Sequence, residues 1–91
     1  SVEQFDRVVS SVELFPNPTD GPLHLRIQVA APTPLAIQLF NAQGQLLRAE
    51  RTERISGRRA WDMDLSGLPA GLYLFRVRAG RGERGFRLVV Q

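Results

Sequence analysis

The feature that most constrains the fold of this chain is the strict alternation of apolar and polar residues over short runs. In "PLHLRIQVA" (residues 22–30), Leu23, Leu25, Ile27 and Val29 fall on one face, and polar residues separate them. A period of two is typical of a β-strand with one buried face. The same period recurs in later runs. The predicted core consists of Leu25, Ile27, Ile37, Leu39, Trp61, Met63, Leu65, Tyr73, Phe75, Val77, Phe86 and Leu88.

Turn signals separate these runs. They are "PTP" (32–34), "NAQG" (41–44), "SGRR" (56–59), "SGLPAG" (66–71) and "GRGERG" (80–85). About seven short strands with such regular turns predict an all-β fold, a small antiparallel Ig-like or fibronectin-III-like β-sandwich. Residues 45–55 are more polar and are predicted to form an edge strand. Residues 1–11 show weak periodicity and are expected to be a linker remnant or an extra edge strand, which leaves 12–91 as the sandwich domain.

Length and composition exclude several classes of protein. Ninety-one residues make one domain. The absence of cysteine excludes disulfides and thiolate metal sites. No run approaches the ~18 apolar residues of a membrane helix, so we expect no membrane insertion. The chain opens at Ser1 without a signal peptide, so we expect it to be the C-terminal piece of a longer protein.

The stretch "ELFPNPTDGPLHL" (residues 13–25) interrupts the alternation with a rigid corner. Pro16 and Pro18 fix φ and remove two N–H donors. Asn17 stands before a proline and is therefore held in an extended conformation. Asp20 and Gly21 favour a turn. Since this corner contains neither a nucleophile nor a base, we predict that it serves as a stiff spacer between strands.

Few residues suggest chemistry. His24 is the single histidine, and its place on the polar face of a strand predicts a solvated surface side chain. Asp62 and Asp64 share a face, as Ca²⁺ ligands or an acid/base pair would. We expect instead that they face solvent and pair with Arg58 or Arg59. The sequence therefore predicts no catalytic, cofactor or metal site.

The basic residues are all arginines. Twelve arginines against nine acids give a net charge of +3. Five of them fall in the last hairpin, near Phe75 and Phe86, and arginines mixed with aromatics can bind nucleic acid. Both phenylalanines are predicted to face inward, however, and the net charge is small for phosphate binding. We expect no nucleic acid partner; an acidic protein surface or an anionic glycan fits better.

Four motifs occur in order: "LFPNPTDGPLHLRI", "LFNAQGQLL", "DLSGLPAGLYLFRVRAG" and a terminal "GFRLVVQ". Together they resemble the C-terminal sorting domain (type A) of the type IX secretion system of Bacteroidota. The matching motif residues are Pro16, Asn17, Pro18, Gly21, Gly44, Leu65, Leu68, Pro69, Gly71 and Tyr73. There are two mild departures from the family pattern: Arg87 stands where many members have lysine, and Asn41 where they often have aspartate.

The resemblance implies a β-sandwich that acts as a non-catalytic secretion signal without a cofactor. Such a domain leads an upstream cargo from the periplasm to the type IX translocon and its outer-membrane shuttle proteins. A sortase-like surface peptidase then commonly removes it, and the cargo stays at the cell surface or is secreted. Residues expected to be read by the translocon are Arg76, Arg78, Arg81, Arg84, Arg87, Leu88, Val89 and Val90.

A different class of function remains open from the residues alone. A fibronectin-III-like or carbohydrate-binding accessory module of an extracellular enzyme also has this strand pattern, and there a tyrosine fits into a corner. Such a module should expose aromatic side chains on one face. Trp61 and Tyr73 are both predicted to face inward, which favours the sorting domain. An enzyme ranks third among the alternatives, because the sequence shows no group of residues that could act together in catalysis.

Overall fold

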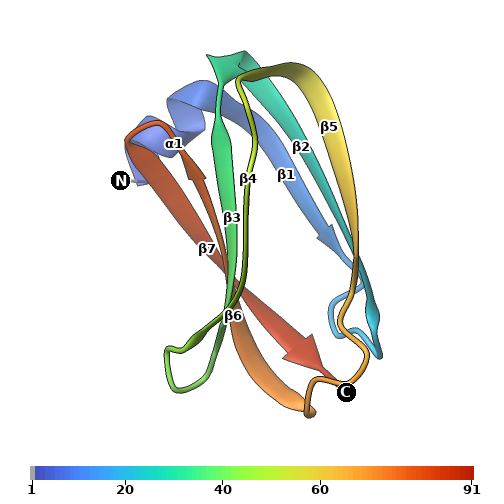
Figure 1. The fold of residues 1–91 in the computed structure, drawn as a ribbon. Helices are drawn as coiled ribbons and strands as arrows, with labels where there is room; N and C mark the ends of the chain where they lie inside the picture. The colour runs from blue at the N-terminus through green and yellow to red at the C-terminus, as the bar shows by residue number, and fades with distance from the viewer. Residues whose placement is uncertain (1) are drawn as a thin grey trace.

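The computed structural model describes residues 2–91 as a β-sandwich preceded by a short helix (Figure 1). The elements are α1 (Val2–Val8), β1 (Val9–Phe15), β2 (Pro22–Thr33), β3 (Leu35–Asn41), β4 (Leu46–Arg51), β5 (Ile55–Asp64), β6 (Gly71–Ala79) and β7 (Gly82–Val90). One sheet has the order β1-β2-β5 and the other β4-β3-β6-β7. All neighbouring strands are antiparallel. The prediction of a seven-stranded all-β sandwich is confirmed.

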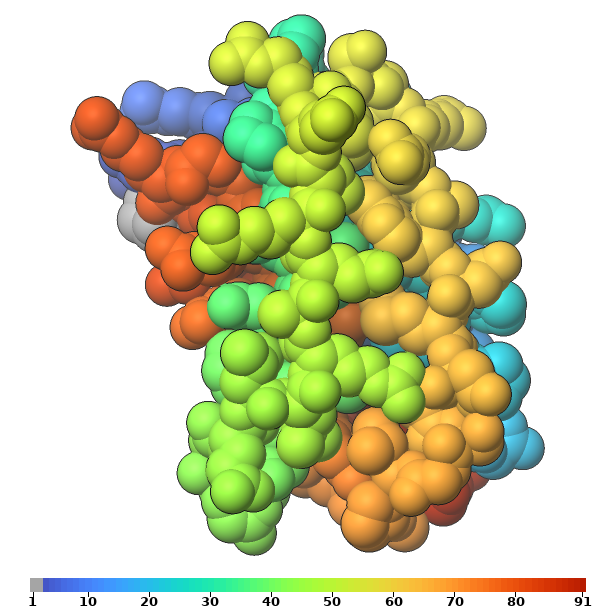
Figure 2. All heavy atoms as spheres, in the orientation of Figure 1, coloured from blue at the N-terminus to red at the C-terminus, as the bar shows by residue number. Residues whose placement is uncertain are grey.

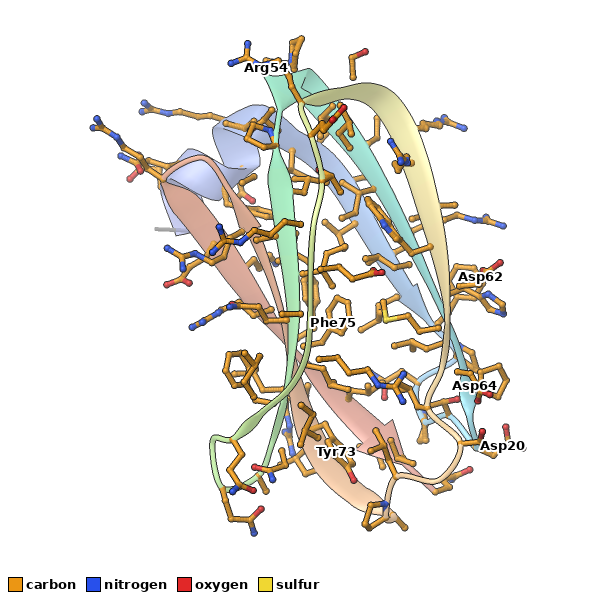
Figure 3. The ribbon with its side chains drawn as sticks, in the orientation of Figure 1. Asp20, Arg54, Asp62, Asp64, Tyr73 and Phe75 are labelled. Carbon is orange, nitrogen blue, oxygen red and sulfur yellow. The ribbon has the colours of Figure 1, made fainter. Side chains whose placement is uncertain are left out.

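The core follows the alternation of the sequence. In residues 23–29 of β2, in β3 and in β6 every second side chain is buried between the sheets, and Phe75 lies at the centre with no exposed surface (Figure 3). Nine of the twelve predicted core residues are buried. The exceptions are Trp61, Met63 and Phe86, which are half-buried. They lie on β5 and β7, which are edge strands, so the opposite sheet covers them incompletely.

Three predicted turns are wrong in whole or in part. At residues 32–34 only Pro34 lies outside a strand, because β2 continues to Thr33, which pairs with Ile55. Residues 56–59 ("SGRR") lie inside β5, where Gly57, Arg58 and Arg59 pair with residues of β2. β2 is twelve residues long and therefore supplies ladder partners to all of this stretch except Ser56, where the register shifts. In "GRGERG" only residues 80 and 81 form the turn, because β7 begins at Gly82.

The turns at residues 41–44 and 66–71 are confirmed, and so is the polar edge strand, which is shorter than expected (Leu46–Arg51). Residues 41–44 join β3 to β4, and the Gly44 amide donates to the Asn41 carbonyl at 3.0 Å. Gly44 has φ 86°, a left-handed conformation that few other residues adopt without strain. All six residues of β4 are exposed, as expected of a strand at the edge of a sheet.

Residues 2–8 differ from the expectation of a linker or an extra strand, because they form α1; Ser1 lies outside the described residues. Phe5 and Val9 are buried, and an exposed pair four residues apart, Glu3–Arg7 (3.7 Å), lies on the outer side of the helix. The helix packs directly on β7. A Cβ atom built on Gly82 would lie 2.2 Å from the Phe5 amide nitrogen, so this close approach requires glycine.

Candidate functional site

The proline corner between β1 and β2 holds the free edge of β7. The Asn17 side chain donates from Nδ2 to the Arg87 carbonyl (2.7 Å) and accepts from the Val89 amide at Oδ1 (3.1 Å). These are the main-chain groups that β7 turns away from β6, because antiparallel strands bond a neighbour through alternate residues. The side chain of Asn17 thus replaces a neighbouring strand, although the prolines on either side of it cannot donate.

Thr19 extends this contact to the end of the chain. Its amide donates to the Val89 carbonyl (2.9 Å), and its carbonyl accepts from the Gln91 amide (2.8 Å), which makes a parallel bridge to β7. Thr19 is 1% exposed, and its hydroxyl accepts from the Gly21 amide (3.0 Å) and donates to the Pro22 carbonyl. The corner is therefore more than a spacer, because it closes an edge that would otherwise be open.

The sequence analysis missed Thr19. A signal for it exists, since a threonine two residues before a glycine favours a turn in which its own hydroxyl bonds the backbone. No local sequence signal predicts its hydrogen bonds to β7, because the partner residues lie some seventy positions later in the chain.

The corner between β5 and β6 (residues 65–70) adjoins the proline corner. The Leu65 amide donates to the Gly21 carbonyl at 2.8 Å, and the Leu65 side chain is buried. Tyr73 is buried, and its hydroxyl donates to the Pro69 carbonyl at 2.5 Å. This is the tyrosine corner known from immunoglobulin-like sandwiches. Leu68 packs half-buried against the core.

All the motif segments gather at one end of the sandwich. The β3–β4 hairpin reaches this end through Asn41, which pairs with Tyr73, and the C-terminus lies there too (Figure 1). We call the four segments together, residues 16–21, 41–44, 65–71 and 87–91, the motif end. Its parts are far apart in sequence. Hydrogen bonds join residues 16–21 to residues 65–71 and 87–91, and residues 41–44 adjoin them through the pairing of Asn41 with Tyr73.

The arginines of the last hairpin do not form one surface. Arg76 and Arg78 both contact Glu83, at 3.6 and 3.8 Å. Arg84 points to the other face of β7, where its guanidinium lies 5.1 Å from the centre of the Phe86 ring. Arg81 lies in the β6–β7 turn, at the end of the sandwich where α1 packs (Figure 1).

The last residues of β7 alternate between core and surface. Leu88 and Val90 are buried, whereas Arg87 and Val89 are exposed on the outer face of the sheet. A partner that binds the folded domain can therefore contact Arg87 and Val89 but not the side chains of Leu88 and Val90.

The remaining candidate residues form small local contacts. His24 is half-buried, not fully solvated, and its Nδ1 lies 2.7 Å from Oδ1 of Asp62. Hydrogen bonds from the hydroxyl (2.6 Å) and the amide (2.9 Å) of Ser66 hold the pKa of Asp64 below its ordinary value. The expected pairing of these aspartates with Arg58 or Arg59 is wrong. Within residues 2–91 no three His, Asp or Glu side chains are grouped closely enough to hold a metal ion.

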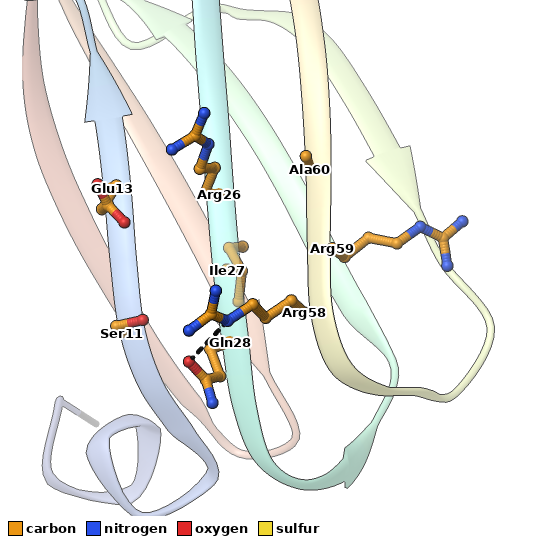
Figure 4. A pocket seen from close by; sticks show the side chains of 8 residues that line it. All are labelled: Ser11, Glu13, Arg26, Ile27, Gln28, Arg58, Arg59 and Ala60. Carbon is orange, nitrogen blue, oxygen red and sulfur yellow. Dashed lines mark hydrogen bonds between the residues drawn. The ribbon is translucent and has the colours of Figure 1, made fainter.

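A shallow pocket of about 370 Å³ lies on the outer face of the β1-β2-β5 sheet (Figure 4). Arg26 and Arg58 are on this face, and Arg58 donates from Nε to Oε1 of Gln28 at 3.3 Å, whereas Arg59 points away. Ser11 and Glu13 line the pocket too, but no histidine does. The pocket therefore has no histidine to act as the base beside a nucleophile such as Ser11.

In the part of the chain that the structure describes, no helix has the length and apolar character needed to cross a membrane.

Comparison with known proteins identifies the family. The family model described as "Secretion system C-terminal sorting domain" matches residues 13–91. No curated protein matches the chain. Among solved structures, dimeric latent PorU from Porphyromonas gingivalis is similar in fold, with a TM-score of 0.69 and 18% sequence identity. The match covers 87% of this chain but 9% of that one, so the chain corresponds to a small part of a much longer protein. The chain belongs to the family of secretion system C-terminal sorting domains, which are sorting signals for type IX secretion.

Proposed function

We propose that this domain leads an upstream cargo through the type IX outer-membrane translocon, and that the export machinery recognises it as a folded sandwich at its motif end. The observation that carries the proposal is the convergence of the motif segments. Asn17 and Thr19 bind the backbone of β7, and Leu65 binds Gly21. A receptor that reads this end reads a surface that exists only once the last strand is in place.

Membership of this family supports a route for the cargo. We propose transit through the periplasm, contact with the translocon and outer-membrane shuttle proteins, and arrival of the cargo at the cell surface or in the medium. A sortase-like peptidase then removes the domain upstream of the sandwich.

The domain itself is proposed to be non-catalytic and to need no cofactor. Its family consists of sorting signals. Among the described residues, the one histidine pairs with an exposed aspartate rather than a nucleophile.

No specific observation favours the accessory-module alternative. The large hydrophobic side chains that residues 2–91 expose are leucines and one valine, not aromatics. Trp61 is half-buried at an edge, with the Arg59 guanidinium 5.9 Å from the centre of its ring.

The test is an export assay. A periplasmic reporter enzyme is fused ahead of this chain and expressed in a host with a type IX system and in the same host without it. We expect reporter activity outside the outer membrane only in the first host. A second fusion that lacks residues 86–91 should stay in the periplasm, because Asn17 and Thr19 then lose their hydrogen-bond partners in β7 and the motif end cannot form. Retention of the complete fusion, or export of the truncated one, would contradict the proposal.

A further inference from the structure

The exposed hydrophobic side chains are concentrated on one of the two sheets. Within residues 2–91 the large ones are Leu46, Leu47, Leu72, Leu74 and Val89. All belong to the β4-β3-β6-β7 sheet, whereas the outer face of the β1-β2-β5 sheet contributes none to this set. Scattered surface leucines are ordinary, but a group of them on one face commonly marks a binding surface.

The strand register brings these side chains together. Phe40, which is half-buried, pairs with Leu46 on one side and with Leu74 on the other. Leu72 pairs with Val89 in a neighbouring row of the same face. Directly paired residues have their Cβ atoms about 5 Å apart. These five residues therefore form one continuous surface, which we call the apolar patch.

A bulge enlarges the patch on the side of β4. The register of β3 and β4 shifts between Leu39 and Phe40, so that Leu46 and Leu47 are both exposed at this point. A bulge of this kind turns a side chain to a new direction.

Part of the patch is hollowed, and this part adjoins the motif end. A groove of about 420 Å³ is lined by Phe40, Leu72 and Leu74 of the patch and by Asn41, Ala42 and Gly44 of the β3–β4 hairpin. Figure 2 shows this hairpin standing out from the lower end of the molecule, so that it can form one wall of the groove.

The charge around the patch is positive. The outer face of this sheet carries Arg51, Arg76, Arg78 and Arg87, and its one acid, Glu83, contacts Arg76 and Arg78. Arg76 also covers the ring of Phe40, at 4.8 Å from its centre. Arg87 pairs with Leu74 in the register and takes part in none of the ion pairs found among residues 2–91.

We infer that the apolar patch together with Arg87 is a docking surface for a folded protein partner that presents an apolar ridge flanked by carboxylates. The inference rests on the proposed function, since it takes this partner to be a component of the export machinery. The concave groove accepts the ridge, and carboxylates neutralise Arg87 and its neighbours.

Two other occupants fit the surface less well. A second copy of the chain would bring its own arginines against these arginines, and like charges across an interface are unfavourable. A lipid surface is flat and contacts projecting side chains, whereas Phe40, Leu72 and Leu74, the middle of the patch, line a hollow of a sheet face.

The experiment compares export of the reporter fusion for three variants. Leu72→Thr combined with Leu74→Thr removes the apolar contact but keeps a residue type that favours strands. Arg87→Glu reverses the charge. Arg58→Glu is the matched control, because Arg58 is an exposed arginine on the outer face of the opposite sheet. Thermal unfolding of each purified domain checks the fold.

We expect roughly tenfold lower export for the double threonine variant and for Arg87→Glu, which corresponds to about 1.4 kcal/mol of lost binding. Arg58→Glu should be exported normally. If both patch variants fold and are exported like the parent chain, the docking surface is refuted while the proposed function stands. If the parent fusion itself is retained, the proposed function fails. If the double threonine variant does not fold, export of Arg87→Glu decides.

Two further measurements exclude the other occupants. Sedimentation of the parent domain should show a monomer. If it shows a dimer, and the double threonine variant is a monomer, the patch mediates self-association and the inference is overturned. Binding to vesicles of phosphatidylglycerol that the same change abolishes would assign it to a membrane, with the same consequence.

Discussion

Substitution of Asn17 by alanine tests whether the proline corner holds β7. The change removes two hydrogen bonds to the backbone of β7, at 2.7 and 3.1 Å. Such bonds contribute about 0.5–1.5 kcal/mol each. Asn17 is exposed, so water can replace it at the freed groups, which places the expected loss near the lower end, at about 1 kcal/mol in total. For a domain of this size that corresponds to a melting temperature lower by about 4–8 °C.

Urea unfolding gives the free energy, and an unchanged dependence on urea concentration would show that the denatured state is unaffected. Hydrogen exchange gives the specific readout, because the Val89 amide loses its acceptor, Oδ1 of Asn17. Hydrogen exchange of the Val89 amide should become faster. The amides of the buried strands should keep the protection from exchange that the free energy of global unfolding gives them.

Asn41→Ala is the matched control. Its side chain also bonds the main chain, accepting from the amides of Gln43 (3.0 Å) and Gln45 (2.9 Å), and it donates to Oε1 of Gln45 (2.7 Å), but all these partners lie in the same hairpin. This variant should lose stability without a local change at Val89. Unchanged exchange at Val89 in Asn17→Ala would refute the view that the corner clamps the last strand, even if the stability fell.

Three further predictions concern the core, the helix contact and pH. Phe75→Ala should cost about 3–5 kcal/mol in urea unfolding, and Trp61→Ala only about 1–2 kcal/mol because the indole is half-buried; equal losses would contradict this. Gly82→Ala should displace α1, because the new Cβ would meet helix backbone at 2.2 Å, and cost about 1–3 kcal/mol; faster exchange of the α1 amides checks this, and unchanged exchange would contradict it. Ser66→Ala removes the hydroxyl that lowers the pKa of Asp64, so that pKa should rise toward 3.8 in an NMR titration. Because the folded-state pKa is lowered, its stabilising effect is present above the ordinary pKa and is lost as the pH falls through the folded value; a variant with an unchanged pKa would disprove the assignment.

The strands and most of the core could be read from local pattern. Alternation in residues 22–30 places Leu23, Leu25 and Ile27 on one face, and all three are buried. This works because the pleat of a strand puts successive side chains on opposite faces whatever the rest of the chain does. The turn at residues 41–44 was equally accessible, since asparagine and glycine suit its backbone conformation.

The helical start of the chain was not accessible in this way. Seven residues with three apolar side chains are too short a run to establish a helical period, and α1 exists because Phe5 packs in the core beside Gly82. Helices this short are unstable alone and depend on tertiary packing. Likewise, residues 56–59 form a strand because β2 is long enough to pair with them.

The candidate site divides along the same line. The sequence motifs contain the residues of the motif end, and their resemblance to a known family predicted the family correctly. Only the register of strands far apart in sequence decided that Asn17 and Thr19 bind β7, that Glu83 pairs with Arg76, and that Leu74 lies beside Phe40. The physical reason is that a side chain's face depends on its neighbours along the chain, whereas its partners depend on how the sheets assemble.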